Sequence, residues 1–393
     1  MKSRVLLTMF LLVLVTGVSK ASVPQISRTI NSMGRIGSNL EWLYVSGNKL
    51  MDGEGEFFLV GAHLRGQARN PATDGIYDDW RTYAEQDATR MEQLGFNVIR
   101  LGTHWECVET SKSPSEFTYD NEYIEKIRQT VEIYNSHNIY VIIALMSHGS
   151  KNELGKFVPT LGKDTDFADE FYSDNSSTSA REHLKRLWLR MSQVFKDYSG
   201  VAGYDICNEP HHSSGSLNNQ QVADLWFDMA DYITDGLRAN EDNHIVFVNF
   251  SPWARYTGFM SRKLNDSNVV YEPHFYYGIN EWDLTVKYND YDNLKSDFDN
   301  NVNAKMLEFD VPFYMGEQGF GGHTINTGDD RDIWLKNTLT IFKTSPNMHG
   351  WTCFCWISYN GNPPYGSDGS AFFGETIVSY ASDKPTQVHF EPG

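Results

Sequence analysis

Residues 201–210 read Val-Ala-Gly-Tyr-Asp-Ile-Cys-Asn-Glu-Pro. Residues 201–207 are mostly apolar and do not alternate strictly with polar residues, which is typical of a strand buried on both faces of a parallel sheet. The run then ends in an amide and a carboxylic acid, Asn208 and Glu209. This stretch therefore predicts a buried strand that carries polar side chains at its carboxyl end.

Seven other stretches share this pattern, and helical periodicity fills most of the intervals between them. We expect these strands at 57–62, 97–101, 139–145, 244–249, 269–274, 311–316 and 350–356, and helices at 80–94, 121–134, 181–198, 218–237, 294–307 (the weakest) and 329–343. Strands that alternate with helices in this number predict an α/β protein built as a single (β/α)8 barrel, the TIM barrel. The alternative is an open doubly wound sheet, but residues 61–66 lack the glycine spacing of a dinucleotide-binding loop.

The first 21 residues differ in character from the rest of the chain. Lys2 and Arg4 precede an apolar run at 5–18, and Ser19 and Ala21 occupy the −3 and −1 positions of a cleavage site after residue 21. This is the layout of a secretory signal peptide, and the run is shorter than the roughly 20 residues that a spanning helix needs. We expect a signal peptide at 1–21, a secreted protein and no membrane span after its removal. No linker divides the remainder, which predicts one catalytic domain at 22–393.

The bulk composition narrows the class of protein. A hydrophobic share of 40% with 21% charged residues is ordinary for a soluble globular domain. The net charge of −18 disfavours nucleic acid as a partner, because phosphates would be repelled. No pattern implies a metal ion or an organic cofactor, and none indicates an oligomeric state. Cys107, Cys207, Cys353 and Cys355 are too sparse for a disulfide scaffold, and their pairing is left open. Cys353 and Cys355 lie in an apolar aromatic run, where we expect small buried core residues.

Polar side chains gather where the predicted strands end. They are Arg100 on the second strand, His148 after the third, Asn208 and Glu209 after the fourth, His274 and Tyr276 after the sixth, Glu317 after the seventh and Trp356 after the eighth. In a TIM barrel these ends meet on one face, where the loops that follow the strands build the active site. The sequence therefore predicts a site at that face.

Two acids and their neighbours suit cleavage of a glycosidic bond. That reaction needs one carboxyl group to protonate the leaving oxygen and one carboxylate to supply electrons to the anomeric carbon. Arg100 and Tyr276 are candidate hydrogen-bond donors to Glu317, and His274 is a candidate partner of Glu209. Asn208 suits a substrate hydroxyl, and Trp356 offers a flat apolar face for a sugar ring. Trp105, Trp253 and Trp282 lie in predicted loops, where packing is the commoner role.

From about residue 40 to 358 the chain resembles glycoside hydrolase family 5, the cellulase family of clan A. The motifs are Asn208-Glu-Pro210, Phe96-Asn-Val-Ile-Arg100, His274-Phe-Tyr276, and Tyr314-Met-Gly-Glu-Gln-Gly-Phe320, together with His148 and Trp356. The resemblance implies a retaining (β/α)8 enzyme in which Glu209 is the acid/base and Glu317 the nucleophile. It also implies supporting roles for Arg100, Asn208, His274 and Tyr276, and substrate binding by His148 and Trp356.

The resemblance leaves the substrate open. Two positions depart from the family pattern: Met146 stands where an Asp is common, and His63 stands where an Asn is common. We expect both departures to affect the sugar-binding rim rather than the proton chemistry. The expected activity is an endo-β-1,4-glucanase (cellulase) acting on a polysaccharide or oligosaccharide, which is the commonest activity in the family. The alternatives are a β-mannanase, another β-glycanase or glycolipid glycosidase, a transglycosylase, and a non-catalytic carbohydrate-binding protein.

Overall fold

The computed structural model describes residues 40–64, 69–70, 75–76, 79–146, 149–151, 157–159, 169–212, 215–280, 283–320, 328–354 and 356. The chain divides into two compact units, Met1–Ile36 and Gly37–Gly393, and every described residue belongs to the second. The predicted signal peptide at 1–21, His148, Trp282 and Cys355 lie outside the described residues.

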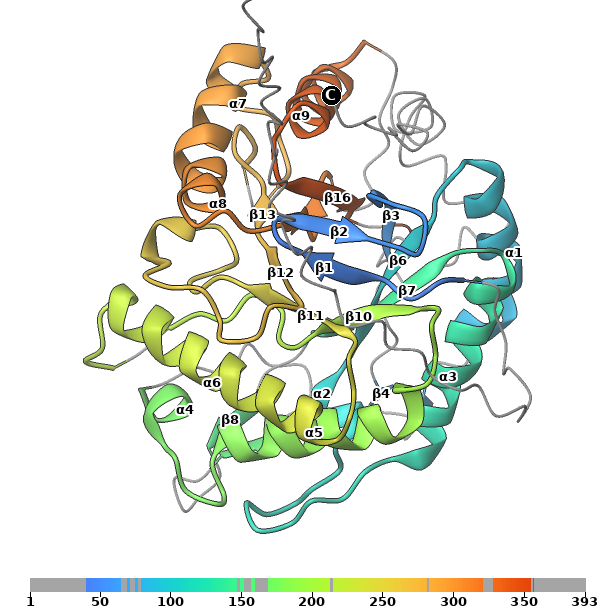
Figure 1. The fold of residues 1–393 in the computed structure, drawn as a ribbon, viewed down its shortest axis with the longest axis vertical. Coiled ribbons are helices and arrows are strands. Elements are labelled where there is room, and N and C mark those ends of the chain that lie inside the picture. The colour runs from blue at the N-terminus through green and yellow to red at the C-terminus, as the bar shows by residue number, and fades with distance from the viewer. Residues whose placement is uncertain are drawn as a thin grey trace, which may run out of the picture. The chain divides into compact units, whose positions relative to one another are not determined.

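Parallel strands close into an eight-membered barrel (Figure 1), which confirms the predicted (β/α)8 architecture and rules out the open sheet. In order around the barrel, the strands are β3 (Leu59–Leu64), β6 (Val98–Thr103), β7 (Tyr140–Leu145), β10 (Val201–Asp205), β11 (Ile245–Asn249), β12 (Val269–Glu272), β14 (Phe313–Met315) and β16 (Met348–Cys353), which pairs with β3. Each of them overlaps one strand expected from the sequence.

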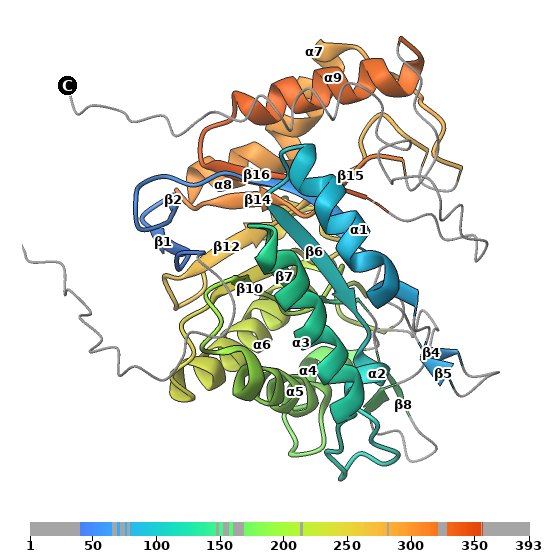
Figure 2. The same ribbon diagram turned by 90° about the vertical axis from the view of Figure 1, so that its right-hand side faces the viewer.

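Helices cover the outside of the barrel, and Figure 2 shows α1, α3 and α5 in succession beside the strands. The helices are α1 (Asp79–Gln93), α2 (Trp105–Val108), α3 (Asn121–Ser136), α4 (Asp169–Ser173), α5 (Ala180–Phe195), α6 (Asn219–Ala239), α7 (Tyr291–Phe298), α8 (Ala304–Glu308) and α9 (Asp330–Lys343). Several begin at a side-chain cap. In α6, for example, Asn218 and Gln221 form a reciprocal capping box.

Two intervals differ from a regular strand–helix alternation. The weak helix expected at 294–307 is divided, because a turn of π-helix at Asp299–Asn303 separates α7 from α8. Between β11 and β12 the described residues contain one short 3-10 helix at Thr257–Phe259. Three antiparallel pairs lie outside the barrel: β1 (Tyr44–Ser46) with β2 (Lys49–Met51), β4 (Arg69–Asn70) with β5 (Gly75–Ile76), and β8 (Gly149–Lys151) with β9 (Phe157–Pro159).

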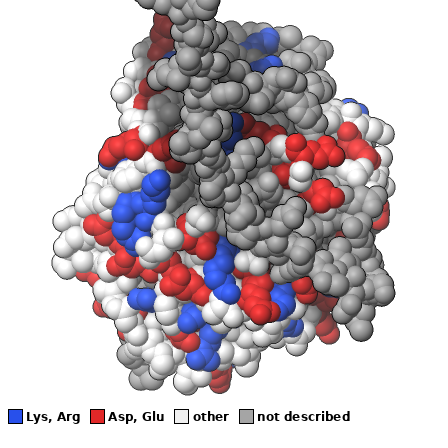
Figure 3. Space-filling view, viewed as in Figure 1, with Lys and Arg blue, Asp and Glu red and all other residues white. Residues whose placement is uncertain are grey.

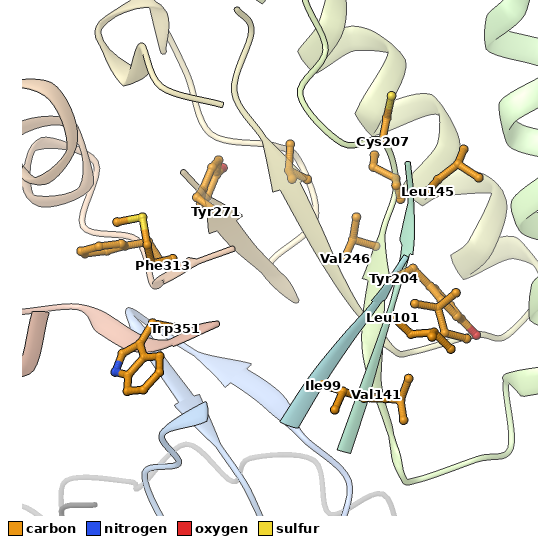
Figure 4. Packing of buried hydrophobic residues seen from close by; sticks show 14 of the residues in the cluster. Ile99, Leu101, Val141, Leu145, Tyr204, Cys207, Val246, Tyr271, Phe313 and Trp351 are labelled. Carbon is orange, nitrogen blue, oxygen red and sulfur yellow. The ribbon is translucent and has the colours of Figure 1, made fainter. Parts of the chain in front are cut away.

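Barrel side chains point alternately into two apolar cores, because successive residues of a strand face opposite sides. On β6, Ile99 and Leu101 belong to the core between strands and helices, which Figure 4 shows in close-up. Val98 on the same strand belongs to the core inside the barrel. Leu50 of the β1–β2 hairpin is fully buried in that inner core, so the hairpin contributes apolar side chains to the barrel interior.

The surface and the cysteines complete the description. On the face shown in Figure 3, Lys and Arg side chains lie interspersed among Asp and Glu side chains. Within the part of the chain that the structure describes, no helix is both long enough and apolar enough to cross a bilayer. Cys107, Cys207 and Cys353 are buried, which confirms the core position predicted for Cys353.

Candidate active site

Arg100 lies at the centre of a buried polar cluster inside the barrel. It follows the inward-facing Val98 by two residues on β6, so its side chain also points inward. Its Nη1 donates to Oε1 of Glu317 at 2.8 Å, and its Nη2 donates to Oδ2 of Asp205 at 2.5 Å and to Oδ1 of Asn208 at 2.6 Å. Burial alone would lower the pKa of Arg100, but the surrounding acidic groups, Glu272, Asp205 and Glu317, outweigh this effect and raise that pKa.

Glu317 receives a hydrogen bond on each carboxylate oxygen. Arg100 donates to Oε1, and the hydroxyl of Tyr276 donates to Oε2 at 3.0 Å. Burial, followed by the charges of Glu317 and Glu209, raises the pKa of Tyr276 well above its usual value, so the phenol keeps its proton and acts as a donor. Both donors expected for Glu317 therefore contact it, and together they hold its carboxyl group in one orientation.

His274 stands between the two acids because of the strand register. Pro273 has no N–H and separates β12 from the short strand β13 (His274–Phe275), which pairs with β15 (Glu317–Gln318) and places His274 opposite Glu317. The Nδ1 atom of His274 lies 2.8 Å from Oε1 of Glu209 and 3.7 Å from Oε2 of Glu317. Burial lowers the pKa of His274 to about 3, so its imidazole is neutral at neutral pH.

Glu209 is held in an unusual backbone conformation. Its φ of +46° lies in the left-handed region, which non-glycine residues occupy mainly where surrounding contacts enforce it, often at active sites. The backbone N–H of Glu209 donates to Oδ1 of Asn249 at 3.1 Å, and Nδ2 of Asn249 donates to Asp205 at 3.0 Å. One ligand-type atom from each of Glu209, His274 and Glu317 lies within 4.8 Å of the others.

The same three side chains are types that can bind a metal ion, but their contacts favour acid–base chemistry. Both oxygens of Glu317 already accept hydrogen bonds from Arg100 and Tyr276. The guanidinium, 2.8 Å from Glu317, supplies the positive charge that a cation would bring. A divalent ion placed here would be repelled by Arg100 and would displace these donors.

The sequence predicted no role for three polar groups of the cluster around Arg100: Asp205, Asn249 and Glu272. Glu272 and Asn249 are fully buried, and each follows an inward-facing apolar residue by two positions, Val270 and Phe247 respectively. This two-residue spacing was the available signal. It marks a polar residue at the last inward-facing position of a strand, before the strand ends.

The two departures from the family pattern lie against Arg100, which corrects the expectation that they affect only the sugar-binding rim. Nδ1 of His63 lies 2.7 Å from Nη1 of Arg100, and Sδ of Met146 lies 3.9 Å from the same nitrogen. His63 also lies 3.6 Å from Oε1 of Glu317 and is fully buried. Both residues therefore surround the group that orients Glu317.

His148 and Trp356 are the two residues that the sequence predicts to bind substrate. His148 lies outside the described residues. The side chain of Trp356 is 1% exposed and packs edge-on against Phe96 with 6.2 Å between ring centroids. Its expected contact with a sugar ring stays a prediction.

Two of the three loop tryptophans lie in the described residues, and they differ in exposure. Trp105 is buried and donates to Glu109, as packing predicts. Trp253 is 43% exposed and stacks on His211 with 3.6 Å between ring centroids. Its backbone N–H donates to the carbonyl of Pro210, the residue after Glu209.

Comparisons with known proteins agree with the barrel fold and indicate the family. The chain is 31% identical over 199 residues to an endoglucanase from Clostridium saccharobutylicum, a match covering 50% of this chain and 36% of that protein. This chain thus spans about a third of that relative's length. Its fold is similar to an endogalactoceramidase (TM-score 0.64, 20% identity, 86% of this chain and 85% of that one). It is also similar to a beta-glucanase from Saccharophagus degradans (TM-score 0.62, 16% identity, 88% and 95%).

The family model for cellulase, glycosyl hydrolase family 5, matches residues 64–361, a span that begins at the end of β3 and includes every site residue predicted from the sequence. The match covers most of the chain, and it agrees with the closed barrel and with the motifs read from the sequence. The chain belongs to the cellulase family, glycosyl hydrolase family 5.

Proposed function

We propose that the protein is a secreted, retaining glycoside hydrolase that cleaves internal glycosidic bonds of β-1,4-glucan. The observation that carries this proposal is the approach of Glu209 and Glu317. One carboxyl oxygen of Glu209 lies within 4.8 Å of one carboxyl oxygen of Glu317, and a ring nitrogen of His274 lies within the same distance of both. Retaining enzymes place their two carboxyl groups about 5–5.5 Å apart, whereas inverting enzymes leave about 6.5–9.5 Å for a water molecule. The short separation supports double displacement.

In the first step, Glu209 gives its proton to the oxygen of the leaving sugar. An oxygen of Glu317 bonds to the anomeric carbon as the glycosidic bond breaks. Arg100 and Tyr276 suit this role for Glu317, because each donates a hydrogen bond to one of its oxygens and so orients the carboxylate. In the second step, Glu209 takes a proton from water, the water oxygen bonds to the anomeric carbon and the bond to Glu317 breaks.

The remaining site residues serve binding and orientation in this proposal. His274 orients Glu209 through their 2.8 Å contact. Asn208 is oriented by Arg100 through its Oδ1, and its amide nitrogen is the atom that we assign to a substrate hydroxyl. We assign His148 and Trp356 to sugar contacts. The endoglucanase relative supports β-1,4-glucan as substrate, and the signal-like segment at 1–21 supports secretion.

Two substitutions separate the roles of the acids. We expect Glu317→Ala to abolish turnover of every substrate, because no other group can form the glycosyl bond. Glu209→Ala should slow substrates with poor leaving groups by about 100- to 10,000-fold and activated aryl glycosides far less, because an activated leaving group needs no proton. Steady-state rates on cellulose oligomers and aryl cellobiosides measure this difference. Equal, mild losses in both variants contradict the roles.

The configuration of the first product tests the mechanism directly. Proton NMR of fresh hydrolysate should show the β-anomer before mutarotation, and the α-anomer would indicate inversion. Reducing-sugar release from cellulose, mannan, laminarin and a glycolipid identifies the substrate. Release from mannan, laminarin or glycolipid alone replaces the β-1,4-glucan assignment. Binding without release from any of them indicates a carbohydrate-binding protein, and larger oligosaccharide products indicate transglycosylation.

A further inference from the structure

Glu272 is a buried acid beside both proposed catalytic residues, and the reaction described above does not use it. It ends β12, with no exposed surface, and follows the inward-facing Val270 by two positions. Gly316, the residue before Glu317, leaves it room: a Cβ at Gly316 would lie 1.9 Å from Oε1 of Glu272. The backbone that carries Glu317 is therefore fitted around the carboxyl group of Glu272.

The hydrogen bonds divide the acids around Arg100 into two kinds. Asp205 accepts from Arg100 and Asn249, and Glu317 accepts from Arg100 and Tyr276. Oε1 of Glu272 lies 2.7 Å from Nε of Arg100, but that N–H donates to Asp205 instead, and neither oxygen of Glu272 accepts an aligned hydrogen bond. Glu272 thus has one charged neighbour, the Nε of Arg100, but no well-aligned donor on either oxygen, so among these acids it is the one whose ionised form is least well stabilised by hydrogen bonds.

His274 has a nitrogen that faces Glu272. Nδ1 of His274 contacts Glu209, while Nε2 lies 4.0 Å from Oε1 of Glu272 and has no hydrogen-bond partner among the described residues. In a neutral imidazole one nitrogen carries the proton and the other is an acceptor. If Nδ1 donates to Glu209, the acceptor Nε2 faces Glu272. A protonated carboxyl suits that position, and an ionised one repels the lone pair.

We propose that Glu272 is a positioning residue that works as a neutral carboxylic acid, directing its proton to Nε2 of His274 and thereby fixing Nδ1–H on Glu209. The inference rests on the proposed function of Glu209. The hydrogen bond from Nδ1–H strengthens as Glu209 gives up its proton and becomes charged, so it stabilises the transition state more than the ground state. A neutral Glu272 also does not compete with Asp205 and Glu317 for the positive charge of Arg100.

The groups that face Glu272 support the neutral form. They are Arg100, Asp205, His274, Tyr314 and Glu317. Burial first, and then the negative charge of Asp205, raise the pKa of Glu272 well above its usual value, and Arg100 offsets this only in part. His274 is neutral, so it supplies no compensating positive charge. Tyr314 keeps its proton and is neutral as well.

Infrared difference spectroscopy tests the protonation state without reference to activity. The wild type at neutral pH should show the C=O stretching band of a buried carboxylic acid, which Glu272→Gln removes and Asp205→Asn retains. A wild-type spectrum without that band, or a band that Asp205→Asn removes instead, overturns the inference. Because this reading is independent of turnover, it stands apart from any failure of the proposed hydrolase activity.

Kinetics of two variants test the positioning role. Glu272→Gln keeps a donor for Nε2, whereas Glu272→Met has a similar size and no donor. On a substrate with a poor leaving group, we expect the Met variant to be about 10- to 100-fold slower than the Gln variant, the range for lost supporting hydrogen bonds at active sites. On an activated aryl glycoside the two should differ by less than about threefold. Equal losses for both variants, or equal effects on both substrates, overturn the inference while leaving the proposed function intact.

Discussion

At the scale of single residues, Arg100 connects the folding of the barrel with the chemistry proposed for it. A buried cation is tolerated only where good partners surround it, and Arg100 contacts Asp205, Asn208, Glu317 and His63. The flat guanidinium can donate along several directions in one plane, which a lysine ammonium at the same position cannot reproduce. The same contacts that offset its burial therefore orient Glu317.

We expect Arg100→Ala to lower the free energy of unfolding by about 3–5 kcal/mol, because removing one partner leaves buried acids uncompensated. Urea unfolding at neutral pH measures this loss. Part of the loss should be recovered at acid pH, where Asp205 can take up a proton. Arg100→Lys should remain well below the wild type in stability.

Arg128 on α3 provides the control, since it pairs with Glu125 and Glu132 on a partly exposed surface. Arg128→Ala should cost no more than about 1 kcal/mol, the usual range for exposed ion pairs. Similar losses at Arg100 and Arg128 would contradict the special role of the buried cluster.

At the scale of helices and strands, the sequence predicted the elements better than their ends and their junctions. Apolar runs marked every barrel strand, because burial on both faces leaves a strong local pattern. The break at Pro273, which puts His274 opposite Glu317, depends on pairing between segments far apart in the chain. The turn of π-helix at Asp299–Asn303 depends on packing around it, and periodicity alone could not indicate it.

The same distinction applies to the candidate site. Residues at strand ends were found because their type contrasts with the apolar run before them. Asp205 lies three residues before Asn208, and Glu272 lies two residues before His274. Both are inside the predicted strands, where the pattern indicated core residues. Only the register between strands shows that both acids face Arg100.

Gly316 tests how closely β14 and β12 are fitted together. Because a Cβ at this position would lie 1.9 Å from Oε1 of Glu272, Gly316→Ala should lower the free energy of unfolding by about 1–3 kcal/mol. In a Glu272→Ala background the same change should cost less by at least about 1 kcal/mol, since the space is then vacant. Chemical denaturation of the four proteins gives this coupling.

Gly258 is the matched control, because a Cβ there meets no atom within 4 Å. Gly258→Ala should change stability by less than about 0.5 kcal/mol in either background. Additive effects of Gly316→Ala and Glu272→Ala would mean that the glycine is needed for a reason other than the acid.

At the scale of the whole molecule, the interior of the barrel makes stability depend on pH in two opposing ways. The pKa of buried His274 falls from 6.5 to about 3, so between these values the unfolded chain binds a proton that the folded protein does not. His274 therefore makes the free energy of unfolding rise with pH. Burial raises the pKa of Asp205 from 3.8 to about 6 despite Arg100, so there the folded protein holds the extra proton and stability falls as pH rises.

The two contributions overlap between about pH 4 and 6, where they partly cancel in the wild type. We expect His274→Asn to make the slope of unfolding free energy against pH more negative across this range, and Asp205→Asn to make it more positive. Each change should amount to at most about 1.4 kcal/mol per pH unit, the value for one proton. Slopes from urea unfolding in matched buffers are the proper measure, because either substitution also changes stability at every pH by altering packing. If both variants keep the slope of the wild type, the pKa values of His274 and Asp205 do not differ between the folded and unfolded protein, and the prediction is wrong.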